Sequence, residues 1–170
     1  MTTGVTVRPA TLEDLPGITE IHNYYVVNTH ITFDVQPSRP EQRLQWFLEH
    51  SGDQRHRLLV ACEAEGTIVG YTCTGRFRTK EAYDTTVESS IACGPGQDGK
   101  GIGTLLYKSL FDALADQDIH RIVAGVAQPN PASNALHARF GFKTIGRFTQ
   151  VGRKFGEYWD VVWMERPLHL

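Results

Sequence analysis

Hydrophobic and polar positions follow two periods along the chain, and each period predicts one kind of element. Alternation with a period of two, or a short apolar run that ends at turn residues, predicts a strand. Apolar positions three and four residues apart predict a helix, and a clear stripe runs through Ile102, Leu106 and Leu110. The pattern predicts strands over residues 5–8, 57–64, 67–77, 87–93, 120–127, 142–150 and 159–166, and helices over residues 11–25, 41–49, 101–117 and 132–139.

The order of these elements predicts a single α/β domain that covers residues 1–170. Helices interleave with hairpins in the order β-α-α-β-β-β-α-β-α-β-β, and Glu65-Gly66 marks one hairpin turn. A long connection over residues 28–40 is expected to form an arm that lines a cleft. We therefore expect a mixed sheet with helices on both faces.

Composition and charge narrow the class of protein. Of the 170 residues, 41% are hydrophobic and 21% are charged, which is typical of a globular domain. The formal net charge of -2 gives no electrostatic basis for binding nucleic acid or an anionic membrane, and no apolar run of about 18 residues predicts a membrane span. Three separated cysteines and the lack of a signal-peptide pattern predict free thiols in a cytoplasmic protein.

One Gly-rich stretch joins the strand at residues 87–93 to the helix at residues 101–117. It reads Gly94-Pro-Gly-Gln-Asp-Gly-Lys-Gly-Ile-Gly-Thr104. Glycine lets backbone N–H groups approach a ligand without a Cβ in the way, and the start of a helix adds unpaired N–H donors and the positive end of its dipole. This combination predicts a phosphate-binding turn. By itself, the stretch fits an ordinary surface turn equally well.

Two nucleotide-binding patterns match this stretch only in part. Residues 94–99 have the spacing of the dinucleotide fingerprint, but Pro95 lacks an N–H, and the following strand offers no acid at its end to hold a ribose. Residues 94–100 nearly fit a P-loop, but Gly101 stands where a Ser or Thr would bind magnesium. We therefore reject both nucleotide-binding interpretations.

Three blocks in chain order resemble the Gcn5-related N-acetyltransferase (GNAT) superfamily. They are the strand over residues 87–93, the turn Asp98-Gly-Lys-Gly101-Ile-Gly103, and Asn130 and Ser133 before His137-Ala-Arg-Phe-Gly-Phe142. The resemblance implies the GNAT fold, a mixed and mostly antiparallel sheet, and acetyl transfer from acetyl-CoA to an amine. Five stretches resemble the phosphinothricin and methionine sulfoximine N-acetyltransferases in particular: Thr32-Phe-Asp, Tyr83-Asp-Thr-Thr-Val-Glu88-Ser, Asn130-Pro-Ala-Ser133, Gly152-Arg-Lys-Phe-Gly156 and Trp159-Asp160.

Glu88 is the residue that we expect to act as the catalytic base. An amine with a pKa of roughly 10 arrives protonated, and it must lose a proton before it attacks a thioester. Alternation places Glu88 opposite Ile91, on the strand that leads into the Gly-rich turn. The resemblance implies that a glutamate at this position is the base. The alternative is a carboxylate on a solvated sheet face or one paired with an arginine.

The resemblance implies that backbone groups hold most of acetyl-CoA. Ile91, Ala92 and Cys93 match residues that pair with the pantetheine arm as an added strand. Asn130 matches a residue that binds the cofactor beyond the pyrophosphate, and Ser133 is a candidate to join it, although a turn and a helix cap fit them equally well. Asp98 stands where the family has Gln or Arg, and Thr104 also fits an ordinary first-turn residue. The pyrophosphate is expected at Gly99, Lys100, Gly101, Ile102, Gly103 and Thr104.

His137 is a candidate for the acid that protonates the leaving thiolate. The resemblance implies this role, and imidazole suits it near neutral pH, but a single histidine on a short helix fits a structural role as well. Cys93 as an acyl-enzyme nucleophile is disfavoured, because nothing near it in the sequence lowers a thiol pKa. The histidines show no metal-ligand spacing, so we expect no metal.

The acceptor is expected to be a small amino-acid-like amine. The resemblance places the segment before Tyr83 at the acceptor site, where Arg78 can bind a carboxylate with both arms of its guanidinium. Arg76 is the neighbouring competitor. Phe33 and Tyr83 are candidate pocket walls, with ordinary packing as the alternative.

The predicted acceptors are phosphinothricin, methionine sulfoximine and methionine sulfone. The alternatives are a polyamine, an aminoglycoside or a protein N-terminus as acceptor, and a non-catalytic acyl-CoA sensor. The resemblance also implies a homodimer.

Overall fold

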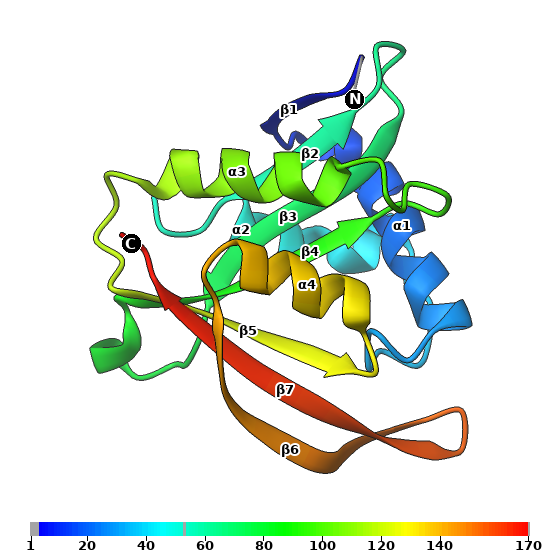
Figure 1. Cartoon of the computed structure of the whole chain (residues 1–170). Helices are drawn as coiled ribbons and strands as arrows, with labels where there is room; N and C mark the ends of the chain where they lie inside the picture. The colour runs from blue at the N-terminus through cyan, green and yellow to red at the C-terminus, as the bar shows by residue number, and fades with distance from the viewer. Residues whose placement is uncertain (1–3, 53, 170) are drawn as a thin grey trace.

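A seven-stranded sheet runs through the protein, for which a computed structural model describes residues 4–52 and 54–169. The strands lie in the order β1-β2-β3-β4-β5-β7-β6 (Figure 1). Neighbouring strands are antiparallel except for β4 and β5, which are parallel. The prediction of a mixed and mostly antiparallel sheet is therefore confirmed.

The predicted strands and helices are all present, with ends that differ by a few residues. The strands are β1 (Thr6–Pro9), β2 (Leu58–Cys62), β3 (Ile68–Arg76), β4 (Thr86–Cys93), β5 (Arg121–Gln128), β6 (Lys143–Lys154) and β7 (Glu157–Pro167). The α-helices are α1 (Leu15–Asn28), α2 (Leu44–His50), α3 (Ile102–Leu114) and α4 (Pro131–Arg139), and 3-10 turns cover Leu12–Asp14, Pro40–Arg43 and Glu81–Tyr83.

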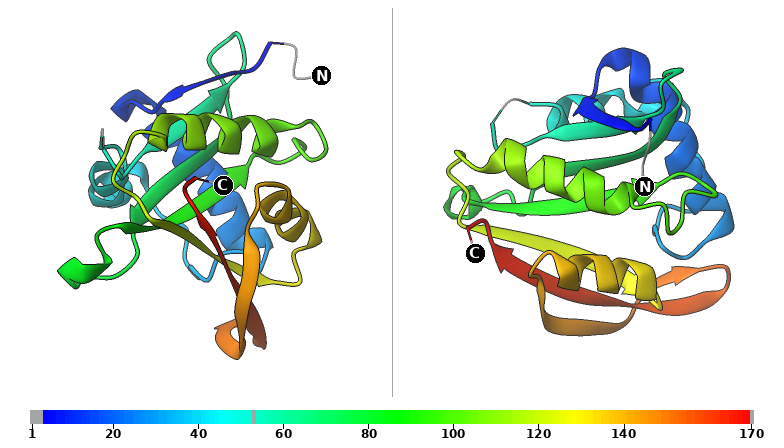
Figure 2. Two further views of the ribbon diagram at one scale, coloured as in Figure 1. Left: turned by 60° about the vertical axis from the view of Figure 1, so that its left-hand side comes forward. Right: turned by 45° about the horizontal axis from the view of Figure 1, so that its top comes forward.

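Helices cover both faces of the sheet, with α3 and α4 on one face and α1 and α2 on the other (Figure 2). On the first face, Tyr107 and Leu110 of α3 pack in a core cluster with Val87 and Ile122 of the sheet. On the second face, Ile18 of α1 belongs to a separate cluster with residues of α2, β2 and β3. Because β4 lies between the two cores, its alternate side chains point into different layers.

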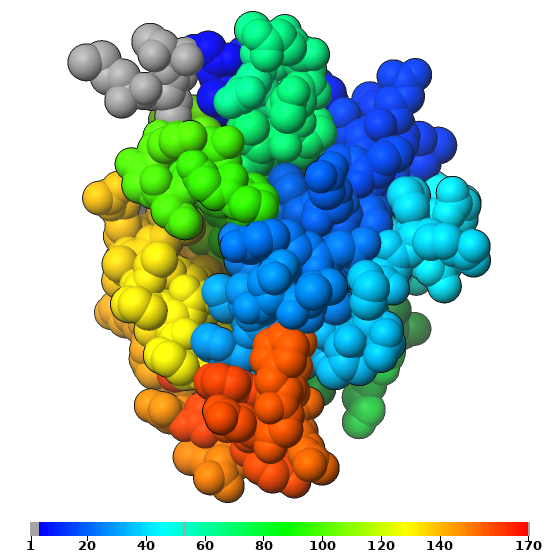
Figure 3. Space-filling view, turned by 90° about the vertical axis from the view of Figure 1, so that its right-hand side faces the viewer, coloured from blue at the N-terminus to red at the C-terminus, as the bar shows by residue number. Residues whose placement is uncertain are grey.

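The segment over residues 29–34, which follows α1, lies beside the tip of the β6–β7 hairpin (Figure 3). Lys154 is only 3% exposed, and its Nζ donates a hydrogen bond of 2.8 Å to the carbonyl of Thr32. The rings of His30 and Trp159 stack with centroids 4.2 Å apart. These contacts hold an otherwise irregular segment in one place, and the hydrophobic pattern of the sequence gives no indication of them.

The same residues, 4–52 and 54–169, include no helix that is both long and apolar enough to cross a membrane.

Candidate active site

The parallel strands β4 and β5 separate toward their C-terminal ends. They pair over residues 86–88 of β4 and 121–123 of β5, whereas β3 pairs with β4 as far as Cys93 and β7 pairs with β5 as far as Gln128. The facing edges over residues 89–93 and 124–128 are therefore open to an extended ligand, which can pair with them as an added strand. The backbone of Ile91, Ala92 and Cys93 lies along this open edge, where the pantetheine arm is expected.

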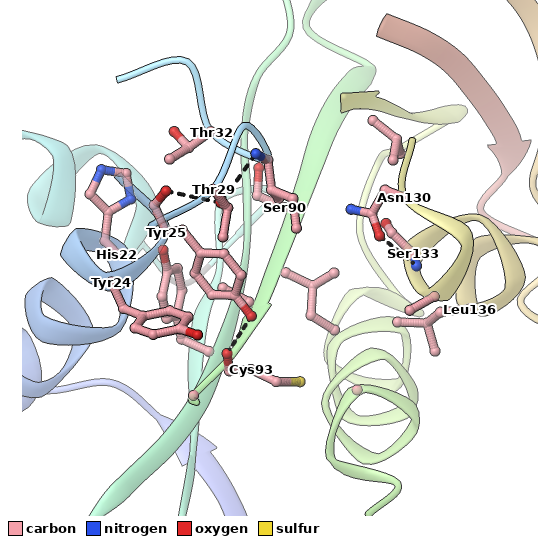
Figure 4. A pocket seen from close by; sticks show the side chains of 18 of the residues that line it. His22, Tyr24, Tyr25, Thr29, Thr32, Ser90, Cys93, Asn130, Ser133 and Leu136 are labelled. Atoms are coloured by element: carbon pink, nitrogen blue, oxygen red, sulfur yellow. Dashed lines mark hydrogen bonds between the residues drawn. The ribbon is translucent and has the colours of Figure 1, made fainter. Parts of the chain in front are cut away.

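Tyr25 of α1 fixes the far end of the open edge. Its hydroxyl donates a hydrogen bond of 2.7 Å to the carbonyl of Cys93 (Figure 4). Burial raises the pKa of Tyr25 to about 12, so the phenol stays a donor at neutral pH. The sequence pattern places Tyr25 on the apolar face of a helix, and it cannot reveal a partner 68 residues away.

The Gly-rich loop turns directly into α3. Gly96, Gly99 and Gly101 have positive φ angles of 73°, 71° and 80°, a conformation that glycine adopts without strain. Gly101 is the N-cap of α3, and the helix begins at Ile102, one residue later than the predicted start at Gly101. The N–H groups of Ile102, Gly103 and Thr104 therefore form the first turn, where no helical carbonyl can accept them and the helix dipole is positive. This geometry fits the pyrophosphate of acetyl-CoA.

Helix α4 forms the opposite wall and packs closely on the start of α3. A Cβ added to Gly103 would come within 3.0 Å of Cδ2 of Leu136, so the side chain of Leu136 lies directly against the backbone of this glycine. Asn130 caps α4, since its Oδ1 accepts the N–H of Ser133 at 3.1 Å. Figure 4 shows Asn130 and Ser133 across the cavity from Cys93. The helix-cap alternative is therefore observed, and both residues also line the cavity.

A cavity of about 750 Å³ lies between the 29–34 segment, the open edge of β4, the Gly-rich loop and α4. This volume is typical of a cofactor site. Predicted site residues that line it are Phe33, Ile91, Ala92, Cys93, Gly99, Gly101, Ile102, Gly103, Asn130, Ser133 and His137. Predicted site residues outside this lining are Arg78, Tyr83, Glu88, Lys100 and Thr104.

Glu88 lies where β4 and β5 stop pairing, directly before the open edge. Its side chain is half-buried, and none of the ion pairs between described residues includes it. Burial raises the pKa of the Glu88 carboxyl, and the positive charge of Arg78 acts in the opposite direction. A raised pKa makes a carboxylate a better base near neutral pH. These properties suit proton abstraction, and the role of Glu88 stays a prediction.

An aromatic cluster lies on the Glu88 side of the sheet. The guanidinium of Arg78 covers the ring of Phe77 at 4.9 Å. Phe77 contacts the rings of Tyr83 and Trp163 edge-on, with centroids 5.8 Å and 6.1 Å apart. The strand register places Trp163 on the same face as Glu88. The sequence analysis did not single out Phe77 and Trp163, because apolar residues in predicted strands indicate packing, and neither residue lines the cavity.

The two neighbouring arginines of this region differ in their partners. Arg76 places Nη2 at 3.1 Å from Oδ1 of Asp84, so a carboxylate of the chain already engages its charge. Arg78 belongs to none of the ion pairs between described residues, and its charge acts on Glu88. The role of Arg78 as receptor for an acceptor carboxylate stays a prediction, and its lack of an ion-pair partner among the described residues agrees with it.

His137 is buried, with 3% of its surface exposed, and both ring nitrogens have partners. Nδ1 lies 2.7 Å from the carbonyl oxygen of Ser133, which can only accept, so Nδ1 carries the proton. Nε2 then accepts from the hydroxyl of Tyr107 at 2.7 Å, and Ser89 lies 3.3 Å beyond that hydroxyl. Burial lowers the pKa of His137, which keeps the ring neutral. The single N–H of the neutral ring is therefore already donated to the carbonyl of Ser133. The role of His137 as the acid stays a prediction.

The thiol of Cys93 borders the cavity without the features of a nucleophile. Burial raises the pKa of Cys93 to about 11, and the charge of Asp98 acts in the same direction. A protonated thiol is a poor nucleophile, which agrees with the prediction that Cys93 does not form an acyl-enzyme. No group of three His, Cys, Asp or Glu side chains suited to a metal ion occurs in the described ranges.

Comparison with known proteins identifies the family. The model of the acetyltransferase (GNAT) domain matches residues 7–163. A phosphinothricin N-acetyltransferase of Streptomyces coelicolor is 54% identical over 168 residues, which are 98% of each chain. An L-methionine sulfoximine/L-methionine sulfone acetyltransferase of Pseudomonas paraeruginosa is 37% identical over 95% of this chain and 94% of its own.

A solved structure agrees with this assignment. The GNAT superfamily phosphinothricin acetyltransferase from Sinorhizobium meliloti, in complex with acetyl-CoA, superimposes with a TM-score of 0.91 at 32% identity. The match covers 97% of this chain and 89% of that one. The resemblance stated from the sequence is confirmed: this chain belongs to the GNAT family of acetyltransferases, which use acetyl-CoA as co-substrate.

Proposed function

We propose that the protein transfers the acetyl group of acetyl-CoA to the α-amine of a small amino-acid-like acceptor. Phosphinothricin, methionine sulfoximine and methionine sulfone are the proposed acceptors, and the names of the relatives at 54% and 37% identity support them. The observation that carries the proposal is the position of Glu88. It is a half-buried carboxylate that lies where the open edge of β4 begins, and the charge of Arg78 acts on its pKa.

Proton removal is the step that this chain must supply. Glu88 takes a proton from the acceptor's ammonium group, directly or through water, and the free amine then attacks the acetyl carbon. When bound, acetyl-CoA supplies that carbon as a thioester. A backbone N–H among residues 91–93 stabilises the charge that develops on the carbonyl oxygen, an interaction worth about 3 kcal/mol in comparable sites. The thiolate that leaves takes its proton from water; His137 supplies one only after its ring has first been protonated.

Arg78 is proposed to bind the α-carboxylate of the acceptor. The carboxylate and the reacting amine share one carbon atom, so the carboxylate's receptor must lie near the base. Arg78 meets this condition because its charge acts on Glu88. Phe33, which lines the cavity, and Tyr83 are the proposed walls around the acceptor's side chain.

A homodimer is part of the proposal. Strand β6 lies at the edge of the sheet and exposes Ile145, Phe148 and Val151 to solvent by 53% or more. An edge strand with exposed apolar side chains is typical of a surface that pairs with another chain. Sedimentation velocity would test this, since a monomer at all concentrations contradicts it. The cytoplasmic location stays a prediction.

The test is acetyl-CoA-dependent thiol release by the purified protein. The panel contains the three proposed acceptors, common amino acids, spermidine and an aminoglycoside. We expect release with the proposed acceptors and its loss in Glu88→Gln. Glu65→Gln, in the exposed β2–β3 turn, serves as the matched control. Release only with the cationic amines would contradict the acceptor class, and silence across the panel with acetyl-CoA bound would favour a sensor.

A further inference from the structure

Arg43 ends the 3-10 turn Pro40–Arg43 and is buried at the cavity described above. Only 8% of its surface is exposed, and it lines the cavity together with Trp46, Tyr71 and Cys73. The guanidinium lies over the ring of Trp46, at 4.3 Å from its centroid. A guanidinium in such apolar and aromatic surroundings is weakly hydrated, so its charge is available to a ligand.

Within the part of the chain that the structure describes, no carboxylate neutralises Arg43. The ion pairs there involve other residues, and the buried Nε of Arg43 has no hydrogen-bond partner. Asp34, an acid on the same cavity wall, instead places Oδ2 at 2.8 Å from Nε2 of His22. By contrast, the guanidinium of Arg8 binds Asp14 with both arms, at 2.6 Å and 2.8 Å.

An uncompensated buried charge is costly, and proteins normally pair it or neutralise it. The charge of Arg43 already acts on its surroundings, because it lowers the pKa of His22 and opposes the rise that burial causes in the pKa of Tyr71. A cation that faces a cavity without a counter-charge is typical of a receptor for an anion. The planar guanidinium suits an oxyanion, which it can bind with two parallel hydrogen bonds.

We propose that Arg43 binds an oxyanion of the acceptor, on the cavity wall formed with Trp46 and Tyr71. This inference rests on the proposed function, since it concerns the acceptor of the same site. Phosphinothricin carries two such groups, its α-carboxylate and its side-chain phosphinate, and both are compact oxyanions. Arg43 and Arg78 would then hold the acceptor at two points, which orients the amine toward Glu88.

Steady-state kinetics of Arg43→Gln test the assignment. We expect the acceptor KM to rise about 10- to 100-fold, the effect of losing a charged hydrogen bond, with the acetyl-CoA KM changed less than about two-fold. Arg57→Gln is the matched control, because Arg57 also has a buried Nε without a partner but does not line the cavity. An unchanged acceptor KM in Arg43→Gln, or an equal rise in both variants, would overturn the proposal.

Three acceptors distinguish the two sources of the oxyanion. Methionine sulfone carries only the carboxylate, the decarboxylated analogue of phosphinothricin carries only the phosphinate, and phosphinothricin carries both. If Arg43 binds the carboxylate, Arg43→Gln impairs phosphinothricin and methionine sulfone. If it binds the phosphinate, the variant impairs phosphinothricin and the analogue. If Arg43→Gln impaired all three acceptors equally, the effect would not depend on which oxyanion is present, and this result would contradict an oxyanion receptor.

A binding measurement separates this inference from the proposed function and from misfolding. Methylphosphinate and acetate are titrated into the wild type, Arg43→Lys and Arg43→Gln while tryptophan fluorescence is followed, since Trp46 lies against the guanidinium. Saturable quenching that weakens in Arg43→Lys and vanishes in Arg43→Gln supports the receptor even if no acceptor is acetylated. Equal responses from wild type and the folded Arg43→Lys protein would overturn it.

Discussion

The two halves of the active site are built from different parts of the polypeptide. The cofactor half is mainly main chain: the open edge of β4 over residues 89–93 and the Gly-rich loop at the start of α3. The proposed acceptor half is mainly side chains: Glu88 comes from β4, Arg78 from the connection after β3, and Arg43 from the 3-10 turn Pro40–Arg43. We therefore expect binding in the first half to depend on backbone conformation and binding in the second half to depend on which side chains are present.

This difference predicts which substitutions each half should tolerate. A change of side chain along the open edge of β4 leaves its N–H and C=O groups in place, so the cofactor half should depend mainly on its glycines. A change at Glu88 or Arg78 removes the chemical group itself. The following predictions test this contrast, from the largest expected effect to the smallest.

Glu88→Gln tests whether the acceptor half depends on one group. We expect kcat to fall by about 10²- to 10⁴-fold, the usual contribution of a general base, with the KM for acetyl-CoA nearly unchanged. Steady-state assays of thiol release with phosphinothricin as acceptor measure kcat and the KM for acetyl-CoA. If Glu88→Gln keeps the wild-type kcat, Glu88 is not the base. The acceptor half would then not depend on this side chain, which contradicts the proposed difference between the halves.

The variant His137→Gln tests whether His137, in the wall of the cofactor half, has a structural or a catalytic role. Its pKa is lowered from an ordinary 6.5 because the ring is buried, so below about pH 6.5 the unfolded chain binds more protons than the folded one. The free energy of unfolding therefore falls as the pH drops through this range. His137→Gln should lose about 2 kcal/mol at about pH 8 and show a weaker fall toward about pH 5.5.

Urea unfolding at several pH values measures this effect. His22, His50 and His56 have pKa values lowered in the same direction, so the difference between His137→Gln and the wild type isolates His137. A variant with unchanged stability and a kcat reduced by about 10²-fold or more would instead assign His137 to the acid role.

Gly101→Ala tests the dependence of the cofactor half on backbone conformation. The φ angle of 80° lies in the left-handed region, where a Cβ costs about 1 kcal/mol or more. We expect the KM for acetyl-CoA to rise about five-fold, while the acceptor KM stays constant. Gly66→Ala is the matched control, because Gly66 has a φ of 90° in the β2–β3 turn, away from the cavity. If the KM for acetyl-CoA rose in both variants, the cause would be general backbone strain and not the conformation of the cofactor site.

Asp98→Gln should produce the smallest change, and it should improve binding. The exposed carboxylate of Asp98 lines the cavity at the Gly-rich loop, where we expect it to repel the pyrophosphate. Its removal should lower the KM for acetyl-CoA about two- to four-fold at low salt, with a smaller effect at high salt. Asp116→Asn, at an exposed position beyond α3, is the control. An increase in KM would mean that the carboxylate helps to hold the cofactor.

Much of the cofactor half could be predicted from the sequence, because its signals are local. Glycines at a strand-to-helix turn indicate both the unusual φ angles and the free N–H groups. The period-two pattern of residues 87–93 also determines that Glu88 and Ile91 occupy opposite faces. The prediction of the helix start at Gly101 was wrong by one residue, since a residue with φ of 80° can cap a helix but not lie within it.

The acceptor half and the walls of the cavity were decided by tertiary structure. Lys154 lies 122 residues from Thr32, and the sequence cannot show that a buried ammonium group binds that carbonyl. His137 meets Tyr107 only because α4 packs beside α3. The separation of β4 from β5 and the burial of Arg43 without a carboxylate likewise depend on how distant segments pack. By itself the sequence determined the elements and, through its resemblance, the family, and it marked the Gly-rich turn as a candidate phosphate site, because those signals come from neighbouring residues. The partners of each buried polar group follow from contacts between elements far apart in the chain.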